Sequence, residues 1–247
     1  MAELLFFILA FVAEVIGTIA GFGSSTIFLP IALFFVDFKT ALILVAFFHI
    51  FGNIGRITFF RHGLDKKLIL IFGVPSVILT IFGALLVNFT PQDILKLVLG
   101  IFLLIFATVS LTKPDFKFKP SNKNAVIGGG LSGFLAGLIG TGGALRGAFL
   151  TAFNLKKEIY ISTAAAIALA VDITRIPVYF VSGFLGQQFY LYLPLLFIIA
   201  IAGSFTGKKI VDKIPQHSFR KFVLAVIAII SLKFIYAGIL FFSETIS

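Results

Sequence analysis

The chain has 247 residues, of which 60% are hydrophobic and 12% charged, and it carries a formal net charge of +10. Its mean hydropathy of +1.14 is too high for a soluble domain of this length, so a soluble globular protein is excluded. There are no cysteines and only three well-separated histidines, which excludes disulfides and argues against a metal centre. We therefore expect one all-α integral membrane domain covering residues 1–247, with the lipid bilayer as its solvent and no cofactor.

Hydropathy divides the chain into apolar segments, most of them long enough to cross a hydrocarbon core of roughly 30 Å as helices. In chain order they cover residues 3–20, 24–36, 40–60, 67–88, 93–111, 125–139, 142–153, 158–181, 189–207 and 217–241. Segments 24–36 and 142–153 span only about 18 to 20 Å at 1.5 Å per residue, too little for a crossing. A glycine-rich break precedes each of them, Gly21-Phe-Gly-Ser-Ser25 and Gly140-Thr-Gly-Gly143. We expect each short segment to form a hairpin with its predecessor, with the glycine tip inside the membrane.

The basic residues lie in short links between the apolar runs, so their excess indicates membrane topology and no nucleic-acid partner. Fourteen of them lie in loops predicted on one side, and two lie on the other side. The basic loops are Arg61 to Lys67, Lys113 to Lys123, Lys156 to Lys157 and Lys208 to Lys221. Because basic loops stay in the cytoplasm, we expect a multi-pass protein of the cell membrane with non-cytoplasmic N- and C-termini.

The two halves of the chain resemble each other at an offset of 119 residues. The first glycine break corresponds to the second, and Asn53-x-x-Arg56 corresponds to Asp172-x-x-Arg175; we call these the two polar pairs. A common order of weak matches indicates an internal repeat.

Equivalent loops in the two halves differ in charge. The basic loop 61–67 corresponds to the uncharged loop 182–188, so the halves are expected to face opposite sides of the membrane. This predicts two inverted-topology repeats, 1–112 and 125–247, joined by a linker at 113–124. Each repeat consists of a broken-helix hairpin plus three transmembrane helices, an arrangement typical of secondary transporters.

Both glycine breaks are candidate parts of an anion-binding site. A helix broken at membrane depth leaves backbone N–H groups that lipid cannot satisfy, and each short arm begins with such donors at the positive end of a helix dipole. Ser24, Ser25 and Thr26 are placed to cap the first arm. The alternative is tight helix packing through small residues. The candidate residues are Gly21, Gly23, Ser24, Ser25, Gly140, Thr141, Gly142 and Gly143.

Ionisable residues within apolar segments each cost at least about 2.5 kcal/mol near the bilayer centre, so each needs a partner or a function. They are Glu14, Arg56, Arg146, Asp172, Arg175 and Lys233. Arg146 lies three residues after Gly143, and its planar fork suits bidentate binding of an oxyanion. The alternative is a structural ion pair with Glu14 or Asp172.

The two polar pairs can each interact across one helical turn. Their recurrence in both halves favours a place in the lining of a cavity. The alternative is that Arg56 and Arg175, which lie near helix ends, extend to the membrane surface.

Glu14 lies one turn before the first glycine break. We interpret it as a candidate proton carrier, because burial favours the neutral form of a carboxyl, or as a counter-ion for Arg146. Lys233 has no counterpart in the first half and is interpreted as a residue that packs between helices or reaches the surface.

The glycine-rich segments resemble those of a known family. The first half contains Gly17-Thr-Ile-Ala-Gly-Phe-Gly-Ser-Ser followed by Pro30, and the second contains Gly133-Phe-Leu-Ala-Gly-Leu-Ile-Gly-Thr-Gly-Gly. With these motifs and two homologous halves, the chain resembles the TauE/SafE family of sulfite exporters over essentially its whole length. The resemblance implies transport of sulfite, sulfonates or thiosulfate across the cytoplasmic membrane. Two departures from the family pattern are Ser24-Ser25, in place of glycines, and Arg146-Gly-Ala-Phe149, which has no counterpart of Pro30.

We therefore expect a secondary transporter, not an enzyme, in which the hairpin tips and the two polar pairs enclose one small anion and the halves rock to give alternating access. A coupling ion, proton or sodium, is a candidate partner. One alternative is a passive anion channel or a carrier of another organic anion. A further alternative is an intramembrane hydrolase using Ser24 and His49, because Gly-Phe-Gly-Ser24 resembles a nucleophile turn. No sequence feature indicates an oligomeric state.

Overall fold

The computed structural model describes residues 2–20, 23–60, 63–113, 118–211, 213 and 216–246, and all regular structure in this part of the chain is helical. Seven of the described helices are long and apolar enough to cross a membrane. The protein is therefore an all-α, multi-span membrane protein, as the sequence predicts.

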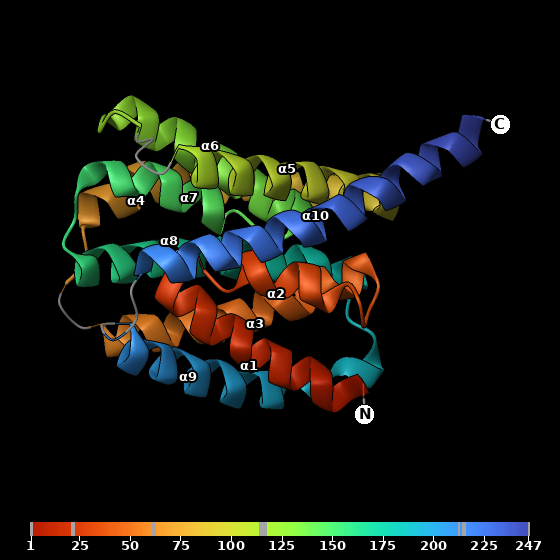
Figure 1. Ribbon diagram of the computed structural model, residues 1–247, viewed down its shortest axis with the longest axis horizontal. Helices are drawn as coiled ribbons and strands as arrows, with labels where there is room; N and C mark the ends of the chain where they lie inside the picture. The colour runs from red at the N-terminus through yellow and green to blue at the C-terminus, as the bar shows by residue number, and fades with distance from the viewer. Residues whose placement is uncertain are drawn as a thin grey trace.

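The helices of the two halves follow one another in the same order (Figure 1). The first half contains α1 (Ala2–Ala20), α2 (Ser25–Ala32), α3 (Phe38–Phe59), α4 (Lys66–Leu86), the 3-10 turn η1 (Val87–Phe89) and α5 (Gln92–Thr112). The second half contains α6 (Asn122–Ile139), α7 (Gly143–Leu150), η2 (Thr151–Phe153), α8 (Lys157–Val181), η3 (Gln187–Phe189), α9 (Tyr192–Ile210) and α10 (Gln216–Ile246). In both halves a short helix follows the first one.

The short helices α2 and α7 form the returning arms of two hairpins. Each has eight residues, about 12 Å at 1.5 Å per residue, which is too short to span the bilayer. Both helices are shorter than the predicted segments 24–36 and 142–153, because a turn follows α2 and η2 follows α7. In Figure 1 the chain enters α1 and leaves towards α3 at one end of the bundle, whereas it enters α6 and leaves towards α8 at the other end.

The two halves pack against each other through equivalent helices. Helix α3 packs on α8, α5 on α10 and α2 on α7, while α1 packs on α9 and α6 packs on α4. In chain order, α1 to α5 of the first half correspond to α6 to α10 of the second half. If each helix is exchanged with its counterpart, the same pairs of helices are in contact. Helices α3 and α8 run in opposite directions in Figure 1, as do α5 and α10.

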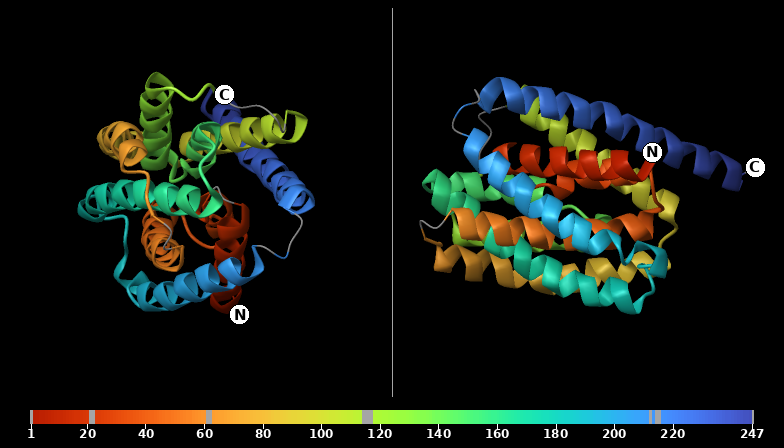
Figure 2. Two further views of the ribbon diagram at one scale, coloured as in Figure 1. Left: turned by 90° about the vertical axis from the view of Figure 1, so that its left-hand side faces the viewer. Right: turned by 90° about the horizontal axis from the view of Figure 1, so that it is seen from below.

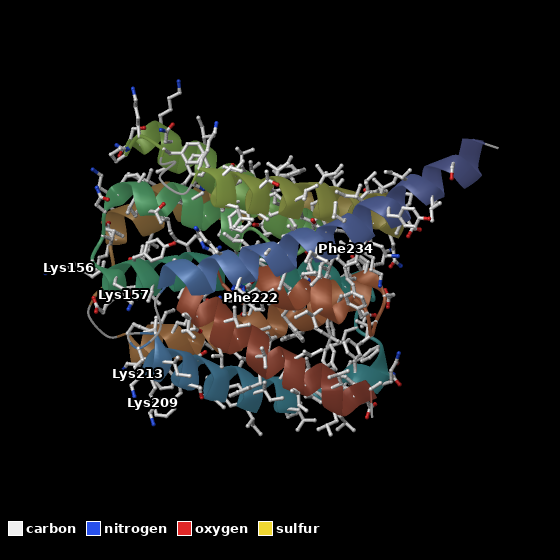
Figure 3. The ribbon with its side chains drawn as sticks, in the orientation of Figure 1. Lys156, Lys157, Lys209, Lys213, Phe222 and Phe234 are labelled. Carbon is white, nitrogen blue, oxygen red and sulfur yellow. The ribbon has the colours of Figure 1, made fainter. Side chains whose placement is uncertain are left out.

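The basic residues gather at one end of the bundle. Figure 3 shows Lys156, Lys157, Lys209 and Lys213 at the same end, and both chain termini lie at the opposite end in Figure 1. Short basic loops on one side are the pattern expected of a membrane protein with a defined orientation.

Helix α3 is the most deeply buried of the candidate spans. In its most apolar 18-residue window, 61% is buried inside the protein, whereas the corresponding share is 22% to 39% for the other candidate spans. The end-on view in Figure 2 (left) shows α4, α6, α9 and α10 at the periphery. The polar side chains of α3 are therefore surrounded by protein and not by lipid.

Helices α4 and α6 approach each other through a row of glycines. Gly129, Gly133 and Gly137 recur every four residues on α6, and a Cβ added to any of them would collide with a carbonyl oxygen of α4. The hydroxyls of Ser76 and Thr80 on α4 donate to the carbonyls of Gly129 and Gly133 at 2.8 and 2.9 Å. Close packing through small residues thus accounts for these glycines.

Replacing Gly133 by alanine is expected to lower the free energy of unfolding of the purified protein by about 1 to 3 kcal/mol, because the new methyl group forces α6 away from α4. Thermal unfolding in detergent measures the effect. The matched control is Gly73→Ala on α4, where an added Cβ meets only Ile167 at 3.8 Å, an ordinary contact. Equal stability of the two variants would contradict the packing argument.

Candidate functional site

The two hairpin tips contact each other through a pair of threonines. The Oγ1 atoms of Thr26 on α2 and Thr141 before α7 lie 2.9 Å apart, and both side chains are buried. Gly23 and Gly140 turn the chain into the two arms with φ angles of +86° and +73°. These angles lie in the left-handed region, where glycine is strongly favoured. Gly21 lies outside the described residues.

The start of each arm differs from the predicted capping. Ser24 is the N-cap of α2 but makes no side-chain cap hydrogen bond; its Oγ instead accepts from Arg56 Nη2 at 3.3 Å. Ser25 is the buried first residue of α2. Gly142 is the N-cap of α7 and Gly143 its first residue. A Cβ on Gly142 would collide with the backbone of α6, so close packing alone explains that glycine.

Arg56 on α3 is held by four side chains. Its Nη2 lies 2.5 Å from Glu14 Oε1 on α1, and its Nη1 donates to Asn53 Oδ1 at 2.6 Å. Its Nε donates to Thr18 Oγ1 at 3.2 Å, in addition to the contact with Ser24. Arg56 is only 5% exposed. It therefore does not extend to the surface, and Glu14 is its counter-ion and not that of Arg146.

Asp172 and Arg175 on α8 form the second buried ion pair. Arg175 donates through Nε to Asp172 Oδ1 at 2.9 Å, and its Nη2 lies 2.8 Å from the same oxygen. Its Nη1 donates to the carbonyl of Ala136 at 2.7 Å. Arg175 is 1% exposed, so its extension to the surface is also wrong. Asn53 Nδ2 donates to Asp172 Oδ2 at 3.3 Å. This bond joins the two polar pairs, one from each half of the chain.

Arg146 on α7 differs from the other two buried arginines. It is 5% exposed, yet its guanidinium forms no ion pair or hydrogen bond within the described part of the chain. Glu14 and Asp172, its predicted structural partners, pair with other arginines. A buried cation without a counter-ion is costly, so a structural ion pair does not explain Arg146.

A small cavity lies between the first hairpin, α3, α7 and α8. It is lined by Gly17, Thr18, Gly23, Asn53, Arg56, Arg146, Ile161, Ala164 and Ala165. The volume open to the centre of a water molecule is about 20 Å³, enough for one or two waters. The cavity therefore brings together Arg146 and the polar pair Asn53/Arg56. The other polar pair is connected to it through the hydrogen bond from Asn53 to Asp172.

The buried charges around the cavity do not balance. Three arginines face two carboxylates, which leaves a formal excess of one positive charge when His49 is neutral. The charged residues are Arg56, Arg146, Arg175, Glu14 and Asp172. In a medium of low dielectric an excess charge attracts an anion strongly, so this arrangement is suited to binding one.

Several residues around the cavity were not predicted as parts of an anion site, although His49 was named in the hydrolase alternative. Thr18 lines the cavity and Ser204 on α9 donates to Glu14 Oε1 at 2.8 Å. His49 lies 2.8 Å from Asp172 through Nδ1. Its position two turns before Arg56 on the same apolar helix was a usable signal, because a histidine within a membrane span is costly without a partner.

Two predicted residues have other surroundings. Lys233 on α10 lies away from the cavity, with its Nζ 3.8 Å from the centre of the Phe34 ring, a cation–π contact. Ser24 bonds to Arg56, and His49 makes no hydrogen bond to it. The nucleophile–base contact of a hydrolase is therefore not formed.

The sequence matches known membrane transporters. Residues 6–234 match the family described as Sulfite exporter TauE/SafE. The chain is also 27% identical over 259 aligned positions to a probable membrane transporter protein of Methanocaldococcus jannaschii, covering 92% of this chain and 93% of that protein. No solved structure matches the chain. Because the family match covers residues 6–234 of a chain of 247 residues, the chain belongs to the TauE/SafE family.

Proposed function

We propose that this protein is a secondary transporter that moves small sulfur-containing anions, of the sulfite, sulfonate or thiosulfate class, across the cytoplasmic membrane. Membrane transport follows from the family and from the similarity to a probable membrane transporter. The finer assignment rests mainly on one observation: Arg146, which is buried and has no ion-pair partner among the described residues, faces a cavity next to the first hairpin tip.

The chemistry of Arg146 favours an oxyanion over a neutral solute. The guanidinium presents parallel N–H donors whose spacing matches two oxygens of one anion. Arg56 and Asn53 line the same cavity and supply further donors. Sulfite, sulfonates and thiosulfate each offer oxygens to such donors, and a monoanion would neutralise the formal excess of one positive charge.

The size of the cavity supports a carrier that changes shape. Room for one or two waters is too little for any of these anions, so the hairpins and α8 have to separate to admit one. We propose that the halves are inverted repeats, as the opposite courses of α3 and α8 and of α5 and α10 suggest, and that rocking of one half against the other opens the site to each side in turn. The end with the basic loops is then cytoplasmic and both termini lie outside.

Uptake by proteoliposomes tests the proposal. We expect saturable, time-dependent accumulation of radiolabelled sulfite, sulfonate or thiosulfate, with each unlabelled anion competing with the others. Empty liposomes and liposomes containing Arg146→Met protein serve as controls. Absence of uptake for all three anions would overturn the substrate assignment. Single-channel currents in planar bilayers would show that the protein is a channel and not a carrier.

Replacing Gly23 by alanine is expected to weaken anion binding about tenfold. The new Cβ would lie 3.0 Å from His49 Nε2 and 3.8 Å from Arg146 Nη2, so it intrudes between side chains at the cavity. Gly183→Ala is the matched control, because Gly183 has a φ of +74° with nothing within 4 Å of an added Cβ. Both variants should lose about 1 to 2 kcal/mol of stability through backbone strain, but only Gly23→Ala should lose affinity in calorimetric titrations. Equal affinities would place Gly23 outside the site.

A further inference from the structure

His49 is a buried titratable group whose role the ion pairs leave unexplained. It is 3% exposed, and its Nε2 has no hydrogen-bond partner in the described residues. Its Nδ1 lies 2.8 Å from Asp172 Oδ2. A buried polar atom without a partner is rare and costly, so packing alone does not account for this histidine.

The Nε2 edge of the His49 ring lies beside Gly23, a residue of the cavity lining. Its Nε2 and the Arg146 guanidinium both converge on Gly23, at 3.0 and 3.8 Å from the position of an added Cβ. Gly23 and Arg146 line the cavity. On the other side of the ring, Asp172 Oδ2 accepts a hydrogen bond from the cavity residue Asn53. An anion in the cavity would therefore lie near Nε2, and Asn53 would connect it to the carboxylate beside Nδ1.

The charges around His49 come from four helices. Asp172 on α8 carries a negative charge 2.8 Å from Nδ1 and attracts a proton to the ring, whereas the positive charges of Arg56 on α3 and Arg146 on α7, which line the cavity, repel one. Two further charges lie behind these groups, Arg175 paired with Asp172 and Glu14 of α1 paired with Arg56. The whole set carries a formal charge of +1 with a neutral imidazole and +2 with an imidazolium. An anion placed against the arginines would cancel their repulsion of the proton.

We propose that His49 takes up one proton when a divalent anion binds, so that the transporter moves a dianion together with a proton and a monoanion without one. This inference rests on the proposed function and adds the coupling ion and the residue that carries it. A closed site of low dielectric holds its contents best when the total charge is near zero. A monoanion balances a charge of +1, and a dianion balances +2.

The ring geometry assigns the proton to one nitrogen. A carboxylate is an acceptor, so the neutral ring keeps its hydrogen on Nδ1, towards Asp172. The second proton then goes to Nε2, on the side of Gly23 and the cavity, and comes from water on the side from which the anion enters. Both nitrogens are donors in the imidazolium, and the proton leaves from Nε2 when the dianion leaves.

Calorimetric titration of the unmodified protein tests the inference with thiosulfate, a dianion, and methanesulfonate, a monoanion; neither titrates between about pH 6 and pH 8, where histidine does. Repeating each titration in buffers of different ionisation enthalpy gives the number of protons taken up. We expect roughly one proton per thiosulfate and none per methanesulfonate. The dissociation constant for thiosulfate should fall up to about tenfold per unit decrease in pH, while that for methanesulfonate should stay constant.

Two variants locate the proton. His49→Gln should abolish proton uptake with thiosulfate, whereas Lys233→Gln, a cation outside the site, should behave as the unmodified protein. Proton uptake that persists in His49→Gln assigns the proton to another group and overturns the inference. Thiosulfate binding without proton uptake in the unmodified protein overturns it as well, without affecting the transporter assignment. If neither anion binds, the proposed function fails and the inference fails with it.

Discussion

Replacement of Arg146 by methionine is expected to weaken binding of sulfite-class anions by at least about 30-fold. Truncating a buried group that pairs with an opposite charge costs about 2 to 5 kcal/mol of binding free energy, and each 1.4 kcal/mol is a factor of about ten. The same variant should be at least as stable as the unmodified protein without an anion, because methionine fills a similar volume and removes a buried cation that has no counter-ion within the described residues. Thermal unfolding with and without anion measures both effects.

Arg146→Lys is the matched control for this experiment. It keeps the charge but loses the planar fork, so its affinity should lie between those of the unmodified protein and Arg146→Met. If Arg146→Met binds anions normally, Arg146 is outside the binding site. If Arg146→Met instead unfolds at a much lower temperature without an anion, the arginine has a structural role that the present contacts do not show.

Replacement of Glu14 by alanine is expected to have the largest effect on folding, a loss of about 3 to 5 kcal/mol. Glu14 is fully buried and its Oε1 lies 2.5 Å from Arg56 Nη2, so its removal leaves a second unpaired arginine in the protein interior. The site also fits this side chain closely, because added Cβ atoms on Gly52 and Gly203 would lie 2.5 to 2.8 Å from Glu14 atoms. Unfolding in detergent, followed by circular dichroism, measures the loss.

The double variant Glu14→Gln with Arg56→Gln separates charge from shape. It removes both charges and keeps polar side chains of similar length, so it should recover more than half of the stability lost in Glu14→Ala. Ser204→Ala removes the hydroxyl that lies 2.8 Å from Glu14 Oε1 and also contacts the carbonyls of Gly52 and Ala200, and it should cost about 1 kcal/mol. A Glu14→Ala protein as stable as the unmodified one would show that the ion pair contributes nothing to folding.

Much of the fold could be predicted because hydropathy is a local property of the chain. Apolar length gave the spans, and the glycine breaks gave the two short arms. Their ends could not be predicted, since the turn after α2 and the 3-10 turn after α7 are as apolar as the helices. The glycines show the same limit: Gly23 and Gly140 serve the turns, whereas Gly129, Gly133 and Gly137 allow close approach of α4.

The candidate site could be predicted only in part. The polar pairs were predictable because their members are three residues apart on one helix, and both contacts are present. The partner of Glu14 could not be predicted, because Arg56 is 42 residues away and Arg146 was an equally suitable positive partner. His49 was not included in the predicted anion site for a similar reason. Its contact with Asp172 joins two helices, and neither segment alone encodes their relative rotation.

The sequence by itself determined that this protein spans a membrane, that two hairpins interrupt it and that six charges lie at membrane depth, since these properties depend on length and composition along the chain. Only the tertiary structure decided which charges neutralise one another. Coulomb energy and hydrogen bonding depend on distances of a few ångströms between helices, so packing alone pairs Glu14 with Arg56 and Asp172 with Arg175, and leaves Arg146 facing the cavity.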